Sequence, residues 1–341
     1  MSRLYRRVAA LQVGTVVVTG GADGTAEAGA GLRISFRAEK RLAESSGGAT
    51  GVKVPTNTAQ VQVYNLAERS RRDIDQAFAQ RAAPSTLPKE ALDLLALVGK
   101  ASGPRSLPRG LSLSAGYETT GLAELYFGEA KWATSFREGT EWVTQIEAST
   151  APGVHATIAS LASKGGPGAT RAARMRGLVE QLQQNNPLYD FSQAFKRLEE
   201  KNLTGALDAL KAAISRGFTA DGPALGELQR LARQAGLEVV LDDDALSLLA
   251  PSETLGDAVV LSPDTGLVGP LRRVFDEKRP ARVAVRGTSL LNPRIRLGCQ
   301  LDIDSTQIAG RFKVYQTVTS GDTHGETWQT EFEAVQIEVS R

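Results

Sequence analysis

Few residues in this 341-residue chain have the type and spacing that chemistry requires. Cysteine occurs once, as Cys299, and histidine twice, as His155 and His324. The two histidines lie far apart with no local ligand spacing, so the sequence predicts no zinc site. Cys299 alternates with Leu301 and Ile303, which indicates a core side chain rather than a nucleophile. A single cysteine also excludes a disulfide within the chain, and folding in a reducing cytoplasm fits this composition.

Three consecutive acids, Asp242 to Asp244, raise the question of a calcium site. A calcium loop takes its ligands from alternate residues, not from consecutive ones. The run also joins two short apolar segments, 237–241 and 245–249. We therefore interpret the three acids as a solvated turn at the tip of a β-hairpin.

A glycine-rich segment, residues 16–24 (VVVTGGADG), superficially matches the cofactor-binding turn of short-chain dehydrogenases. That turn must lead into a helix whose N-terminus holds the pyrophosphate. Here Gly29 and Gly31 lead instead into an alternating strand, and no Tyr-x-x-x-Lys pair occurs in the chain. We interpret the segment as a glycine-rich hairpin, and the sequence predicts no cofactor.

Carboxylates are available for hydrolysis in the middle of the chain, at Glu180, Glu199, Glu200 and Asp208. Glycoside hydrolysis needs two carboxyl groups that face each other across a cleft at a defined separation. The spacing of these four shows no such pair, and charge on helix surfaces is the simpler explanation. The sequence therefore predicts no catalytic, metal-binding or cofactor-binding residues, and we expect that the chain is not an enzyme.

The composition is that of an ordinary globular protein, with 41% hydrophobic and 23% charged residues. A net charge of +2 provides no global electrostatic footprint for nucleic acid. No apolar run approaches the roughly 20 residues that span a bilayer, and the arginine-containing N-terminus leads into a strand, so we expect neither a membrane segment nor a signal peptide.

A ten-residue pattern occurs twice and is the most informative feature of the chain. Gly139–Ala148 reads GTEWVTQIEA and Gly325–Ala334 reads GETWQTEFEA, with five identities at a constant offset. In both copies the apolar residues share one parity, which predicts a half-buried strand entered through a glycine turn. The residues predicted to form the structural core of the repeat are Trp142, Ile146, Trp328 and Phe332, together with the turn glycines Gly128 and Gly310.

The repeat extends upstream of each tryptophan. In both copies a strand is followed by a glycine turn, with Lys131 three residues after Gly128 and Lys313 three residues after Gly310. A duplicated antiparallel unit explains this order. We predict an α+β, mainly β chain with two small antiparallel β-barrels or sandwiches, one near each end, and a helical domain between them.

Three domains are predicted from the change in period along the chain. The first barrel spans 1–164, starts with strands at 8–18 and 32–38, and carries a helical and loop excursion at 67–108. A helical domain that ends in a hairpin spans 165–256, with helices at 169–184, 191–201, 203–215 and 223–235. The second barrel spans 257–341, and a shift of parity at Ala334 and Val335 predicts a β-bulge there.

Several segments at both ends of the chain have a specific resemblance. They are VQVYNL at Val61–Leu66, LSPDTGL at Leu261–Leu267, LLNP at Leu290–Pro293 followed by Gly298, and GDTHGETW at Gly321–Trp328. In this order they resemble the YNLS, SPETGL, LLNP and GDTxGxxW stretches of phage tail baseplate hub proteins of the T-even type. The resemblance covers about half of the chain, and the long excursion at 67–108 departs from the pattern of a minimal hub.

The resemblance implies a double-barrel fold similar to the tail-tube subunit, and assembly into a homotrimer. Three copies with two barrels each give six near-equivalent units, which adapt a hexameric tail tube to a trimeric spike and line the channel for DNA ejection. Implied partners are the spike, distal tail or tail-tube proteins, the tape-measure protein, and baseplate wedge proteins if the tail is contractile. DNA is met only in transit. The implied location is the virion tail baseplate, assembled in the host bacterial cytoplasm.

Loops between barrel strands are expected to contact neighbouring subunits or partners. The loop residues expected to do so are Gly20, Asp23, Asn292, Pro293, Asp322 and His324. Two alternatives remain open: the equivalent hub of a type VI secretion system or other contractile injection system, and a hub whose middle domain acts on or binds the cell wall.

Overall fold

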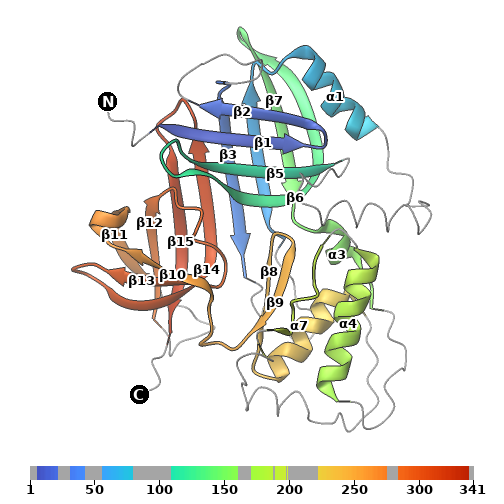
Figure 1. Ribbon diagram of the computed structural model, residues 1–341, viewed down its shortest axis with the longest axis vertical. Coiled ribbons are helices and arrows are strands. Elements are labelled where there is room, and N and C mark those ends of the chain that lie inside the picture. The colour runs from blue at the N-terminus through green and yellow to red at the C-terminus, as the bar shows by residue number, and fades with distance from the viewer. Residues whose placement is uncertain are drawn as a thin grey trace.

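A computed structural model describes most of the chain: residues 6–21, 31–42, 56–79, 109–159, 170–186, 189–196, 198, 222–274 and 283–337. It is mainly β, with one 13-stranded sheet, a separate two-stranded hairpin and few helices (Figure 1). In the ranges described, no helix is long and apolar enough to cross a membrane. The predicted helix at 203–215, part of that at 191–201, the second part of the predicted excursion at 67–108, and Asp23 lie outside the described residues.

The sheet has an amino-terminal and a carboxy-terminal half, with a mixed segment between them. The first half contains β1 (Arg7–Val13), β2 (Val16–Gly21), β3 (Ile34–Arg41), β4 (Thr58–Tyr64), α1 (Glu68–Ala79), β5 (Gly110–Tyr117), β6 (Gly121–Glu138) and β7 (Glu141–Ser149). The middle segment contains α3 (Pro152–Ala156), α4 (Arg171–Asn185), α7 (Ala224–Gln234), β8 (Glu238–Asp242) and β9 (Ala245–Leu249). The second half contains β10 (Leu255–Leu261), η2 (Pro263–Thr265), β11 (Leu267–Val274), β12 (Ala284–Leu290), β13 (Cys299–Asp304), β14 (Ala309–Asp322) and β15 (Trp328–Gln336).

The two halves have the same strand order. Neighbouring strands run β3-β4-β7-β6-β5-β1 in the first half and β11-β12-β15-β14-β13-β10 in the second. We call these the amino-terminal and carboxy-terminal units. All their pairings are antiparallel except β10 with β13, and β2 is an additional strand beside β1. The duplication seen in the sequence is therefore a duplication of a six-stranded topology.

Hydrogen bonds outside the strand ladders repeat in both units. The backbone N–H of Asn65 donates to the Trp142 carbonyl (2.7 Å), and that of Leu291 donates to the Trp328 carbonyl (3.2 Å). A β-bulge also recurs. The β6–β7 register shifts between Ala130 and Trp132, opposite the Glu-Ala step of β7, and the β14–β15 register shifts at the matching step of β15.

The predicted bulge near Ala334 thus exists, but the extra residue is Tyr315 on the partner strand β14. Ala148 faces Ala130, whereas Ala334 faces Val314. The upstream alignment predicted from the glycines is therefore wrong by two residues, because Gly128 lies two positions before Ala130 while Gly310 lies four before Val314.

The buried apolar side chains form several clusters. One cluster fills the amino-terminal unit and includes Ile34, Val61 and Ile146, and another fills the carboxy-terminal unit. A third cluster holds α4, α7 and the β8–β9 hairpin together through Met175, Leu228 and similar residues. Burial of such side chains contributes roughly 1.5–3 kcal/mol each.

In the middle segment, capping signals mark where α4 begins and where α7 ends. α4 begins after Thr170, whose hydroxyl accepts the Ala173 backbone N–H (3.2 Å). α7 ends at Gln234, and two residues later the positive φ of Gly236 (70°) lets the Leu237 N–H reach the Ala232 carbonyl (2.8 Å). These helices confirm the predicted segments at 169–184 and 223–235 to within a few residues.

Two strand predictions were wrong. Residues 8–18 form two strands, because Gly14 takes a left-handed φ of 56° and turns β1 back on itself as β2. An apolar run with one central glycine does not distinguish a long strand from a tight hairpin. β11 was not predicted at all, because Gly269 and Pro270 interrupt its alternation.

Candidate assembly interface

One strand of the carboxy-terminal unit, β14, joins the two units. It pairs with β15 over most of its length, and its second half also pairs with β3 of the amino-terminal unit. The register places Gln316 opposite Arg41 and Asp322 opposite Ser35. In Figure 1 the two units accordingly lie side by side, with β14 and β3 at the junction. The junction is therefore a continuous backbone ladder between two copies of the same topology.

Aromatic packing seals the junction at one end. Trp328 is 4% exposed, and its ring lies edge-on to Phe36 (5.5 Å between centroids) and Tyr117 (6.4 Å) of the amino-terminal unit. Gly321 makes the close approach possible, because a Cβ there would lie 2.5 Å from Phe36 Cζ and 2.7 Å from Trp328. Such edge-on pairs contribute about 0.5–1.5 kcal/mol beyond burial.

The loop after β14 is held in a fixed shape by Asp322. This carboxylate accepts hydrogen bonds from Arg33 Nη2 (2.8 Å) and from the backbone N–H groups of His324 (2.9 Å) and Gly325 (3.0 Å). Burial alone would raise the pKa of Asp322, but Arg33 and the two N–H groups outweigh burial and lower it. His324 itself is exposed at the tip of this loop.

The same loop is bound to the amino-terminal unit by hydrogen bonds. The Ile34 N–H donates to Thr323 Oγ1 (3.0 Å), and the Thr323 N–H donates to the Ile34 carbonyl (3.0 Å). Arg7 donates to the carbonyls of Gly325 and Glu326. Sequence reasoning predicted Asp322 and His324 as partner contacts; in the structure, Asp322 bridges the two units within one chain.

A buried charge cluster fixes the β8–β9 hairpin to both units. Lys40 Nζ of β3 donates to Asp242 (2.9 Å) and Asp243 (2.6 Å), and Arg296 donates to the same carboxylates (2.8 and 2.6 Å). The Phe127 backbone N–H also donates to Asp243 (3.0 Å). Buried charges are stable only when paired and hydrogen-bonded in this way.

The cluster corrects the interpretation of Asp242 to Asp244 as a solvated turn. The residue Asp243 is fully buried and Asp242 is 9% exposed. Burial would raise the pKa of Asp242 and lower that of Lys40, but the opposite charges outweigh burial, so the pKa of Asp242 is lowered and that of Lys40 is raised. Nothing local in the sequence signals this, because the cations are about 50 and 200 residues away.

The other end of the hairpin is held by a second buried contact. Glu238 accepts hydrogen bonds from Lys313 Nζ (2.7 Å) and from the Tyr315 hydroxyl (2.6 Å), both on β14. The Lys313 side chain is 1% exposed. With charged anchors at both ends, the hairpin and its helices are tied to the junction of the two units. The lysine of the predicted glycine-turn pattern thus has a structural role.

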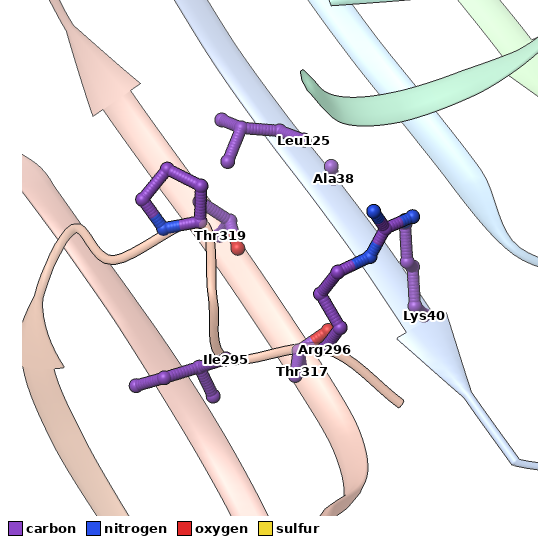
Figure 2. A pocket seen from close by; sticks show the side chains of 8 residues that line it. Ala38, Lys40, Leu125, Ile295, Arg296, Thr317 and Thr319 are labelled. Carbon is purple, nitrogen blue, oxygen red and sulfur yellow. The ribbon is translucent and has the colours of Figure 1, made fainter. Parts of the chain in front are cut away.

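A small pocket lies beside this cluster. Its lining comes from β3, β6, β14 and the loop after β12, and consists of Ala38, Lys40, Leu125, Pro293, Ile295, Arg296, Thr317 and Thr319. Figure 2 shows Arg296 reaching toward Lys40 across these strands. Pro293 and the neighbouring Asn292, predicted as partner-loop residues, therefore belong to a loop that packs between the units.

The opposite side of the sheet forms a polar face that crosses both units. Strand register places one set of half-buried or exposed side chains on this side, alternating with the core: Arg286 and Thr288 on β12, Gln329, Glu331 and Glu333 on β15, Gln316 and Ser320 on β14, Ser35, Arg37, Glu39 and Arg41 on β3, Gln60 and Gln62 on β4, Gln145 and Glu147 on β7, and Trp132 and Thr134 on β6. Glutamine is the most frequent residue type among them, and the arginines and glutamates nearly balance.

The two repeat tryptophans have unequal environments. Trp328 is buried at the junction, but Trp142 is 39% exposed, with the Arg71 guanidinium 3.9 Å from its ring centroid. The prediction that Trp142 is a core residue is therefore wrong. The physical reason is that Trp328 is covered by the other unit, whereas no described unit of the chain covers Trp142.

The remaining predicted residues lie on strands, so the prediction that Gly128 and Gly310 form turns is wrong: Gly128 lies within β6, paired with Leu111, and Gly310 is the second residue of β14, paired with Ile303. Ile146 and Phe332 are buried at 0% and 3% exposure in the cores of their units. At Gly128 a Cβ would lie 2.7 Å from the Ser149 carbonyl oxygen, and Gly310 has a φ of 140°. Gly20 is packed at the end of β2, where a Cβ would lie 2.5 Å from the Leu32 carbonyl oxygen.

Comparison with known proteins identifies the fold. No family model matches the sequence, and no curated protein is similar to it. A tail protein from Neisseria meningitidis MC58 has a similar structure (TM-score 0.54, 9% identity), covering 97% of each chain. So does the 43 kDa tail protein of prophage MuSo2 from Shewanella oneidensis (TM-score 0.52, 9% identity), covering 96% of each chain. The chain thus has the fold of phage tail proteins over nearly its whole length.

Proposed function

We propose that this protein is the structural hub of a phage tail baseplate. Three copies would form a ring with six similar units, which stacks on a hexameric tail tube on one side and on a trimeric spike on the other. In this proposal each unit is a barrel similar to the tail-tube subunit, and the role is structural rather than catalytic.

The junction between the two units carries the proposal. Each chain already holds two copies of one topology, joined head to tail by the β14–β3 ladder. A head-to-tail contact between different surfaces of a repeated unit generates a ring when its rotation closes. Two units per chain then give six-fold pseudo-symmetry from three-fold symmetry. The fold shared with tail proteins supports the same reading.

The polar face supports a channel role. A wall rich in arginine and lysine would bind DNA phosphates through counterion release and hold the DNA in place. The wall formed here by β3, β4 and β7 carries uncharged Gln60, Gln62 and Gln145 among balanced charges. Such a surface lets a polyanion pass without strong binding, as DNA in transit requires.

The partners follow from the position at the tail tip. We propose contacts with the spike, with distal tail or tail-tube proteins, with the end of the tape-measure protein, and with wedge proteins in a contractile tail. The protein would be assembled in the host bacterial cytoplasm and would act in the virion.

Native mass spectrometry and electron microscopy of the purified protein test the proposal. We expect a particle of three 36.3 kDa chains and ring-shaped averages with three-fold symmetry and six similar lobes. A protein that stays monomeric at every concentration, or forms a two-fold dimer, contradicts it. Deletion of the gene from a producing prophage should yield phage heads without functional tails.

A further inference from the structure

The distal half of β6 has a strand on one side only. β6 pairs with β7 as far as Glu138, but its pairing with β5 ends at Glu129. Among the described strands, none pairs with the outer edge of residues 131–138. The equivalent stretch of the carboxy-terminal unit is Gln316–Asp322 on β14. Trp132 of β6 faces Glu147, Gln316 of β14 faces Glu333, and these two glutamates occupy the same position of the repeat. That stretch is paired with β3.

β11 is the second open edge. It is the last strand of the sheet and pairs with β12 alone among the described residues. Its equivalent in the amino-terminal unit is β3. Gln60 of β4 and Arg286 of β12 are equivalent, because they face the repeat residues Glu147 and Glu333. Arg37 of β3 faces Gln60 and Arg272 of β11 faces Arg286, so Arg37 and Arg272 are equivalent as well. These two open edges are thus the counterparts of the two strands that already pair inside the chain, whereas β2 and β10, which also have a single partner among the described strands, are not equivalent to either strand of that ladder.

We propose that the outer edge of β6 pairs antiparallel with β11 of a second copy of this chain, and so repeats between copies the β14–β3 ladder that exists within one. This inference rests on the proposed function, because it supplies the contact that would close the ring. Transfer of the β14–β3 register places Phe136 opposite Arg272, Ser135 opposite Arg273 and Thr134 opposite Val274.

The exposed apolar side chains support this pairing. Large hydrophobic residues are exposed on both edges: Trp132 (38%) and Phe136 (39%) on β6, and Val268 (44%) on β11. Trp142, at the adjacent end of β7, is 39% exposed, whereas its repeat partner Trp328 is buried against the neighbouring unit. A second copy on this edge would cover Trp142 as the neighbouring unit covers Trp328.

β11 also limits where pairing can occur. Its register against β12 shifts between Val268 and Arg272, and Pro270 in this bulge has no N–H to donate. The regular ladder is therefore confined to Leu271–Val274. Bulges and prolines on edge strands prevent indiscriminate association, so this edge should accept one register of one partner.

Engineered disulfides test the pairing. The variant Ser135→Cys/Arg273→Cys, made with Cys299→Ala, brings one thiol of each copy beside one thiol of the next if the register is correct. We expect oxidation to yield covalent species that end at three chains on a non-reducing gel, because the ring closes. Continued growth beyond three chains would contradict closure.

Two matched variants serve as controls. Ala38→Cys/Thr319→Cys occupies the template position of the β14–β3 ladder and should cross-link within one chain, with no change in oligomer size. Ser135→Cys/Val268→Cys is out of register and should remain uncross-linked. A trimer that forms without the Ser135–Arg273 cross-link overturns the proposed pairing but leaves the proposed function standing. A protein that remains monomeric contradicts both.

Discussion

The unequal exposure of Trp142 and Trp328 allows a matched test of the junction. Replacement of either by alanine removes the same atoms from equivalent positions of the repeat. Trp328 is 4% exposed and contacts Phe36 and Tyr117, so we expect Trp328→Ala to lower the free energy of unfolding by about 3–5 kcal/mol. Trp142 is 39% exposed and has one strong contact, with Arg71.

For Trp142→Ala in the monomeric chain the expected loss is smaller. The cation–π contact contributes about 0.5–1 kcal/mol, and partial burial of the ring brings the total to about 1–2 kcal/mol. For association between copies, Trp142→Ala should have the larger effect of the two replacements. If a second copy covers Trp142, its replacement weakens association, whereas Trp328→Ala acts mainly on the fold of each chain.

Urea unfolding, followed by circular dichroism on dilute protein, measures the first effect, and sedimentation velocity across a concentration series measures the second. Equal losses of stability for Trp142→Ala and Trp328→Ala would refute the assignment of the junction as the cause of their difference.

Three further outcomes follow from the described contacts. Lys40→Met leaves the buried Asp243 with one cation fewer and should destabilise the fold by about 3–5 kcal/mol, with hydrogen exchange fastest in β8 and β9; adding Asp243→Asn should recover part of the loss. Pairing lowers the pKa of Asp242 and raises that of Lys40, whereas burial raises the pKa of Asp243 to about 6. As pH falls, Asp243 therefore takes up a proton first, near pH 6, and Asp242 follows below its ordinary 3.8, so the gap in unfolding midpoint between wild type and Lys40→Met should shrink from about pH 6 downward, and a constant gap down to pH 2 would contradict this. At the alkaline end, the contribution of Lys40 is lost as pH rises through its raised folded pKa. Gly321→Ala should lower the thermal midpoint through a clash with Phe36 that costs about 1–3 kcal/mol, whereas alanine at the open Gly139 turn meets no neighbour and strains only the backbone.

The sequence predicted the strands whose period is regular. The repeated segments at 139–148 and 325–334 alternate, and β7 and β15 occupy them to within a few residues. β11 was missed because a bulge with Gly269 and Pro270 breaks its alternation. Periodicity reports the burial along one strand, so the parity shift at Ala334 located the bulge but did not show that the extra residue, Tyr315, lies on the partner strand β14.

The interface residues were harder to predict. The repeat identified Trp142 and Trp328 as equivalent, which is correct for their place in the topology, but equivalence in sequence predicts equal burial only if both units have the same neighbours. The acidic turn was misjudged for a similar reason. Asp243 is paired with Lys40 and Arg296, and contacts at such separations leave no local pattern.

The junction between β14 and β3 has a mechanical consequence. Its ladder runs from Gln316 to Asp322 and is reinforced by the ion pairs of Lys40 and Arg296 with Asp243 and by the packing of Trp328 on Phe36, so the two units of one chain separate only if all of these contacts break together. In the proposed ring, the three junctions inside chains would resist radial load in this way, while the three between chains would be held by the shorter ladder on β11 and by the cover of Trp142. When a large cargo passes, such a ring would widen at the three contacts between chains, and the two units of each chain would stay together.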